Sequence, residues 1–204
     1  ARMPRTKQEA IAEFRVETIL EAAHRVFSAK GYEGATIQEI AEAAGIAKGT
    51  VYLYYESKLD LYWATLKQGM EELRVQTVAA VGAAASPEEA IRAFIRTKAD
   101  HFEKHRDFFA MYFTEFGQAV VMRAPCQQAI DDSYIAQTGI LAEAIAKGIE
   151  EGRVRPVNAR KVAFAVFDVT RGLVARRTRG WSSATLDEDV ETAFDLVWKG
   201  LEAR

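Results

Sequence analysis

Apolar side chains recur every three or four residues over most of the chain, which is the spacing of one face of an α-helix. The first such stripe covers residues 11–30. Gly31 follows it, at a position where glycine often takes the left-handed conformation that ends a helix. Only 4 prolines interrupt the 204 residues. The pattern therefore predicts an all-α protein.

Two short helices are predicted after the first one. Thr36 and Glu39 stand three residues apart, as in a capping box, and predict a helix over residues 37–44. Gly45 then breaks the pattern, and residues 48–54 are long enough for about two helical turns. A tight turn therefore joins two short helices.

A longer fourth helix is expected to connect this part of the chain to the rest. Ser57 is its expected N-cap, and the small residues of 82–87 mark its end. Periodicity then predicts five further helices, over residues 87–105, 107–117, 127–151, 158–179 and 186–201. The total is about nine helices.

The last two predicted helices carry apolar residues on more than one face. Phe164, Phe167 and Leu173 lie in the first of them, and Phe194 and Trp198 lie in the second. The core of one domain cannot cover two faces of a helix. Another copy of the same chain is the commonest partner for such a surface. We therefore expect a homodimer formed through the last two helices.

Composition favours a globular protein of the cytoplasm. Hydrophobic residues make up 49% of the chain and charged residues 27%, which is ordinary for a globular protein. Cys126 is the only cysteine, so an internal disulfide is excluded and a reducing compartment is favoured. No apolar run approaches the roughly 20 residues that cross a bilayer. No membrane association is expected.

The net charge of -2 argues against a protein that coats nucleic acid by bulk electrostatics. Any contact with DNA must therefore be local. Arg2, Arg5 and Lys7 make the start of the chain basic. Both a flexible arm that reaches a duplex and a solvated tail fit this stretch.

The spacing of Ala41, Gly45 and Val51 is that of a helix-turn-helix. Such a motif needs a small residue where the helices touch, a glycine with positive φ in the turn, and an apolar residue that holds the second helix. An ordinary helical hairpin could share this spacing.

The whole block from Thr36 to Lys58 resembles the DNA-binding domain of the TetR family of repressors, and the resemblance extends back to residues 27–32. It implies a DNA-binding domain in residues 1–56 and a ligand-binding and dimerisation domain in residues 57–204. The family usually has a histidine and a phenylalanine where this chain has Tyr54 and Tyr55, so Tyr55 must find a partner for its hydroxyl or stay partly exposed.

The resemblance and the positions of the residues together indicate how double-stranded operator DNA would be bound. Lys48 and Lys58 are expected to contact phosphates, while Gly49 and Thr50 let the recognition helix enter the major groove. The predicted DNA-binding residues are Thr36, Lys48, Gly49, Thr50, Tyr52, Tyr54 and Lys58. A cap without a DNA contact is an equally good interpretation of Thr36.

A crowd of aromatic residues predicts the site of a small apolar effector. The expected ligand-binding residues are Phe102, Phe109, Tyr112, Phe113, Phe116, Met122, Phe167 and Arg171. The aromatics could instead simply fill the core, and Arg171 could pair with Asp168. The family resemblance favours a pocket.

No catalytic constellation is visible, so we expect no enzyme and no cofactor. His101 and His105 have the spacing of metal ligands on a helix, but solvated histidines are the commoner case and no metal site is expected. An enzyme or a helical adaptor that binds no DNA is the alternative to a regulator. The pattern identifies neither the effector nor the operator, and it does not separate a repressor from an activator.

Overall fold

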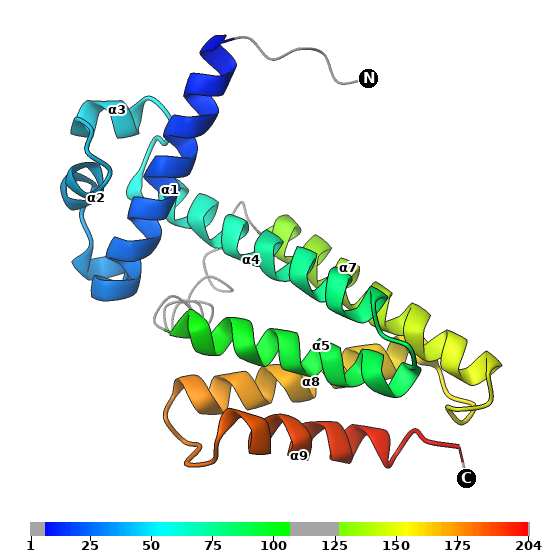
Figure 1. The fold of residues 1–204 in the computed structure, drawn as a ribbon. Helices are drawn as coiled ribbons and strands as arrows, with labels where there is room; N and C mark the ends of the chain where they lie inside the picture. Colours follow the sequence, from blue (N-terminus) through cyan, green and yellow to red (C-terminus); the bar gives the residue numbers. More distant parts are fainter. Residues whose placement is uncertain (1–6, 107–126, 204) are drawn as a thin grey trace.

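The computed structural model describes residues 7–106 and 127–203, and the regular elements of this part of the chain are all α-helices, with no strand (Figure 1). The eight described helices are α1 (Lys7–Gly34), α2 (Ile37–Ala43), α3 (Lys48–Tyr52), α4 (Lys58–Gly82), α5 (Pro87–Lys104), α7 (Gln127–Glu150), α8 (Ala159–Thr178) and α9 (Leu186–Trp198). The predicted all-α fold with a helix-turn-helix is confirmed. The predicted helix over residues 107–117 lies outside the described residues.

Helices α1, α2 and α3 form the N-terminal unit (Figure 1). Helix α2 packs against α1 and α3, and α1 also packs against α4. Phe27 and Ile40 are fully buried in its core beside Tyr62 of α4. Gly31 has the predicted positive φ, 68°, and its backbone is not helical, so the first continuous helix ends there as predicted. A short helical turn follows the break and reaches Gly34, the end of α1.

Helix α4 belongs to both halves of the molecule. Its first half packs against α1, and its second half packs against α5 and α7. Ser57 caps its start, as predicted, by accepting a hydrogen bond from the Asp60 amide at 3.1 Å. The N-terminal unit is thereby attached to the rest through one continuous helix.

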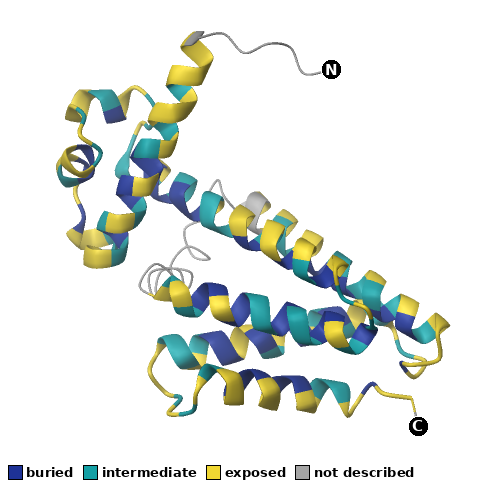
Figure 2. Ribbon diagram, viewed as in Figure 1, coloured by how far each residue is buried: buried dark blue, intermediate teal, exposed yellow. Residues whose placement is uncertain are grey.

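Helices α4, α5, α7, α8 and α9 make the C-terminal bundle, in which α5 contacts each of the other four. Figure 2 shows that the buried residues of these helices face one another. Gly148 of α7 allows a close approach to α5, because a Cβ there would lie 2.7 Å from a side-chain atom of Pro87. On the other side, buried Asp189 of α9 accepts a hydrogen bond of 2.7 Å from Arg177 of α8, which also pairs with Glu103 of α5.

Candidate nucleic-acid interface and ligand domain

The turn between α2 and α3 has the predicted helix-turn-helix geometry. Gly45 has a positive φ of 67°, and the amide of Ile46 donates to the carbonyl of Ala41 at 3.0 Å. Ala41 and Val51 are both fully buried, so the small residue and the apolar residue pack α2 and α3 together. These three predictions are confirmed.

One side of α3 faces away from the protein. Lys48 and Gly49 are exposed, Thr50 is half-buried, and Tyr52 is 47% exposed. Leu53, directly after the helix, is 82% exposed and was not predicted as a site residue. A Cβ added at Gly49 would meet no atom within 4 Å, so the packing of the protein does not explain the glycine.

Thr36 forms the predicted capping box at the start of α2. Its hydroxyl accepts from the Glu39 amide at 3.2 Å, and the Glu39 carboxylate accepts from the Thr36 amide at 3.0 Å. The same carboxylate pairs with Lys30 at 2.5 Å, and this hydrogen bond, with those from Thr36, lowers the pKa of Glu39. The cap is confirmed, and the contact between Thr36 and a phosphate stays a prediction.

Lys58 points into the protein rather than along its surface. Its ammonium donates to the carbonyls of Tyr32 at 2.7 Å and Ala35 at 3.1 Å, and lies 4.4 Å from the centre of the Tyr32 ring. These carbonyls lie where α1 ends, so Lys58 supplies the donors that the end of a helix lacks. The predicted phosphate contact stays a prediction, and it would compete with these hydrogen bonds.

Tyr54 and Tyr55 lie just beyond α3 and pack against the core. Both are half-buried, so Tyr55 has kept the partial exposure that its hydroxyl was expected to require. Burial raises the pKa of Tyr55. The phosphate contact expected of Tyr54 remains a prediction.

Only three of the predicted ligand-binding residues are described. Phe102 and Phe167 are buried, whereas Arg171 is exposed and pairs with Asp168 at 3.5 Å, the alternative noted above. Five others lie outside the described residues: Phe109, Tyr112, Phe113, Phe116 and Met122. Sequence reasoning missed Lys98, a buried lysine whose ammonium lies 4.1 Å from the centre of the Phe167 ring.

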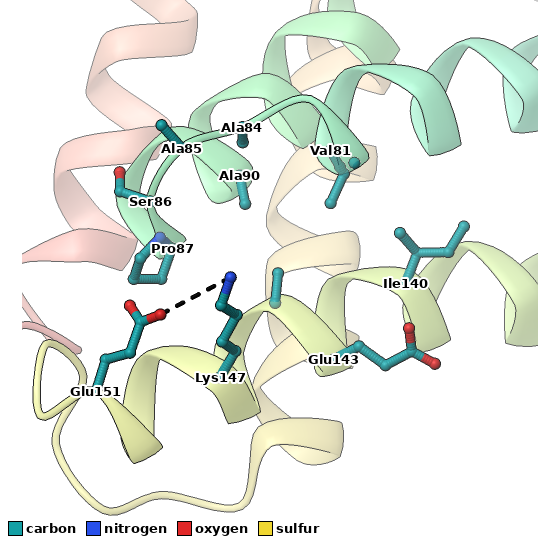
Figure 3. Close-up of a pocket in the computed structure, with 12 residues that line it drawn as sticks. Val81, Ala84, Ala85, Ser86, Pro87, Ala90, Ile140, Glu143, Lys147 and Glu151 are labelled. Atoms are coloured by element: carbon teal, nitrogen blue, oxygen red, sulfur yellow. Dashed lines mark ion pairs between the residues drawn. The ribbon is translucent and has the colours of Figure 1, made fainter.

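A cavity of about 260 Å³ opens at the end of the C-terminal bundle that is remote from the N-terminal unit (Figure 3). It lies between α7 and the loop that joins α4 to α5, and small side chains such as Ala84 and Ala90 line it together with Ile140. Lys147 and Glu151 pair across its rim at 3.8 Å. It contains none of the predicted ligand-binding residues.

A second cavity of about 260 Å³ lies where α1 meets α4 and α5, and all 3 histidines of the chain line it. The ring centre of His105 lies 5.6 Å from that of His24 and 4.8 Å from that of His101. Burial, and then the neighbouring histidine, lower the pKa of His24 and bring that of His101 to about 4.

Among residues 7–106 and 127–203, no three His, Cys, Asp or Glu side chains are grouped as metal ligands. The described helices also include none long and apolar enough to cross a membrane.

Comparison with known proteins gives the same family for the N-terminal unit. Residues 19–65 match the family model described as bacterial regulatory proteins, tetR family. The regulator YerO of Bacillus subtilis is 33% identical over 101 residues, which are 48% of this chain and 35% of that protein. The regulator BetI of Rhizobium meliloti is 36% identical over 49% of each chain. The matches to these two relatives thus span half of their length or less.

Other relatives match over most of the chain. The activator FasR of Mycolicibacterium smegmatis is 27% identical over 90% of this chain and 81% of its own. A TetR family regulator from Marinobacter aquaeolei has a crystal structure that covers 96% of this chain, with a TM-score of 0.69 and 25% identity. The structure of AibR with isovaleryl coenzyme A and operator DNA covers 90% of this chain, with a TM-score of 0.68 and 24% identity.

The helix-turn-helix geometry, the matched residues 19–65 and the shared architecture of both halves point to one family. The N-terminal unit thus matches the tetR family of bacterial regulatory proteins over residues 19–65, and the chain as a whole is similar to regulators of that family.

Proposed function

We propose that this chain is a cytoplasmic transcriptional regulator that binds a palindromic operator as a homodimer. Residues 1–56 would bind DNA, and residues 57–204 would bind the effector and form the dimer. A small, largely apolar effector would release the protein from the operator, so that the protein acts as a repressor.

The exposed side of α3 carries this proposal. Lys48, Gly49 and Tyr52 face solvent on the second helix of a helix-turn-helix, the helix that enters the major groove in proteins with this motif. The open space at Gly49 permits a close approach of a DNA backbone or base edge. Lys48 supplies a cation for a phosphate beside it.

A dimer follows from the size of the recognition helix. α3 has 5 residues and can make only a few base contacts, each of which discriminates by about 1–3 kcal/mol. One copy therefore cannot select a site among millions of competing sequences, and two copies on a palindrome roughly double the discrimination. Leu196 of α9 is 71% exposed, and it supports an interface built on α8 and α9.

Helix α4 offers a route between the effector and DNA, because it packs against α1 at one end and against α5 and α7 at the other. We expect effector binding to displace α4 and so change the distance between the two recognition helices. Such a coupling is typically worth about 1–3 kcal/mol and is reciprocal, so operator DNA should weaken effector binding by the same factor. Equal effector affinity with and without operator DNA would refute this mechanism.

Activation is the second candidate, because the relative FasR is an activator and its similarity extends over most of the chain. In vitro transcription from the selected operator separates the two. A repressor lowers the transcript when it is added without effector, and an activator raises it.

In vitro selection from a random duplex library at near-physiological salt tests the DNA-binding proposal. The intact protein should enrich a palindrome, and the double variant Lys48→Ala, Tyr52→Ala should not. Lys147→Ala, at an exposed lysine of α7, is the matched control and should enrich the same palindrome. If the intact, folded protein enriches no sequence, the alternatives of a helical adaptor or an enzyme are favoured instead.

A further inference from the structure

Lys98 lies in the middle of the C-terminal bundle with 2% of its surface exposed. It stands on α5, and its ammonium donates to the side-chain carbonyl of Gln137 on α7. The same ammonium lies 4.1 Å from the ring centre of Phe167 on α8 and 5.3 Å from that of Phe94. Three helices therefore converge on one buried cation.

The groups that contact this ammonium are neutral. Gln137 is fully buried and uses its own amide to donate to Ser133 at 3.0 Å. Among the described residues, no carboxylate forms an ion pair with Lys98. Burial alone accounts for the pKa of Lys98, which is lowered to about 7. Asp189, another buried charged residue in the described part of the bundle, has both Arg176 and Arg177 as partners, whereas Lys98 forms no ion pair there.

A buried ammonium without an acidic partner is costly. An amide oxygen and two aromatic faces compensate only part of the hydration that the ammonium loses. A side chain selected for packing alone would be apolar at this position, since a buried charge is rarely better for stability than an apolar group of similar size. A perturbed, buried ionisable group inside a domain is more typical of a binding site.

The position of Lys98 connects it to the predicted effector site. Phe167, which its ammonium contacts, and Phe102, one turn further along α5, are the two buried aromatics of that site that the structure describes. The prediction of an apolar effector rested on a crowd of aromatic residues and did not include Lys98. Resting on the proposed function, we propose that Lys98 and Gln137 bind the carboxylate of an otherwise apolar effector.

The charge of the site favours a carboxylate over a phosphate ester. One ammonium balances one negative charge, and a doubly charged phosphate would leave an uncompensated charge in the interior. The ammonium has three donors and gives one to Gln137, so others are available to carboxylate oxygens. The faces of Phe94 and Phe167 would contact the apolar part of the ligand.

Matched pairs of ligands test the proposal by isothermal titration calorimetry of the full chain without DNA. The pairs are octanoate with octanol, decanoate with decanol, and benzoate with benzyl alcohol. The intact protein should bind the carboxylate at least tenfold more tightly than the alcohol in one pair or more. Lys98→Met should remove this preference and retain alcohol binding, and Lys98→Arg should restore part of it. Lys147→Met, which changes an exposed lysine, should keep the preference of the intact protein.

Lys98→Met removes a buried charge and is expected to fold, which circular dichroism checks directly. Preference for the carboxylate that survives in folded Lys98→Met would overturn the proposal, as would an intact protein that prefers no carboxylate in any pair. Carboxylate binding that depends on Lys98, in a protein that selects no operator, would leave this inference standing and refute the proposed function. Operator binding without a carboxylate preference would refute this inference and leave the proposed function standing.

Discussion

The packing of the folded chain does not explain Gly49, so we assign this residue a role in binding DNA. It lies on the exposed side of α3, and no atom lies within 4 Å of the place where its Cβ would be. A Cβ at this position therefore meets no collision within the folded chain. It would, however, occupy the space through which we propose that DNA approaches.

We predict that Gly49→Leu retains the stability of the intact protein and loses at least tenfold in operator affinity. Leucine has the higher helix propensity, so the thermal midpoint should stay the same or rise. Differential scanning calorimetry and fluorescence anisotropy with the selected operator measure the two quantities. Unchanged operator affinity in Gly49→Leu would contradict our orientation of the recognition helix.

Lys48 and Lys58 make a matched pair of lysines with opposite expected roles. Lys58→Met should destabilise the protein by about 1–2 kcal/mol, because it removes charge-assisted hydrogen bonds to the carbonyls at the end of α1. Lys48→Met should leave the stability unchanged and weaken operator binding. Urea unfolding and anisotropy titrations of both variants provide the comparison. Equal stability of the two variants would mean that the capping by Lys58 contributes little.

The residues that the sequence revealed are those whose roles are local. The capping box of Thr36 and Glu39, the positive φ of Gly45 and the cap at Ser57 each depend on neighbours a few residues away. Lys98 carries no such signal, because its environment comes from Gln137 and Phe167 on other helices. Lys58 was assigned to DNA from the resemblance and its position. The carbonyls that it contacts lie more than twenty residues earlier, so no local pattern revealed them.

At the scale of elements, the junction of α1, α4 and α5 brings together titratable side chains that are far apart in the sequence. His24 comes from α1, and His101 and His105 come from α5 and its end. The charged groups that shift the pKa values of these histidines are Arg25 of α1, Glu72 of α4, and Lys98 and Lys104 of α5. Glu21 and Arg106 line the cavities beside them. Only the packing of these helices reveals the cluster, since His24 forms no local motif with the other two histidines.

We predict that this junction loses stability as the pH falls from 7 to 5. The pKa of each histidine lies below its unfolded value, so the unfolded chain binds more protons below about pH 6.5 and unfolding becomes easier. His101, with a pKa of about 4, alone accounts for a loss on the order of 2 kcal/mol at pH 5.

Urea unfolding of the intact chain and of His101→Gln at pH 7 and pH 5 measures this effect. The variant should show a smaller loss between the two pH values. Its remaining loss reports on His24, His105 and the carboxylates. An identical pH dependence in both proteins would show that the position of His101 does not disfavour its protonation.

At the scale of the whole molecule, the sequence pattern was enough to predict the order of the helices. It was not enough to predict which apolar residues of α8 and α9 remain exposed for contacts between copies. The order of the eight described helices followed from periodicity, and their ends differ from the predicted ones by a few residues. The two-faced apolar character of the last helices predicted a dimer. In the single chain, much of that apolar surface packs internally, as Phe167 and Phe194 do, while Leu196 remains exposed.

We predict that Leu196→Glu converts a dimer into a monomer, because a charge in the centre of an apolar interface is strongly unfavourable. Sedimentation velocity should show the smaller species, and operator affinity should fall with it. Val75→Glu, at an exposed apolar residue of α4, is the control and should leave the dimer intact. A dimeric Leu196→Glu would move the interface away from this part of α9.

Helix α4 is 25 residues long, which corresponds to roughly 37 Å at about 1.5 Å per residue. In the proposed mechanism α4 acts as a lever with one end in each half of the molecule. A tilt of about 5° at one end would displace the other by roughly 3 Å, a large fraction of the spacing between neighbouring base pairs. Such a lever would transmit an angle, so we expect the N-terminal unit to respond to the direction of a movement and not to the chemistry that caused it. The ligand preferences of the C-terminal bundle can therefore change while the DNA-binding surface stays the same.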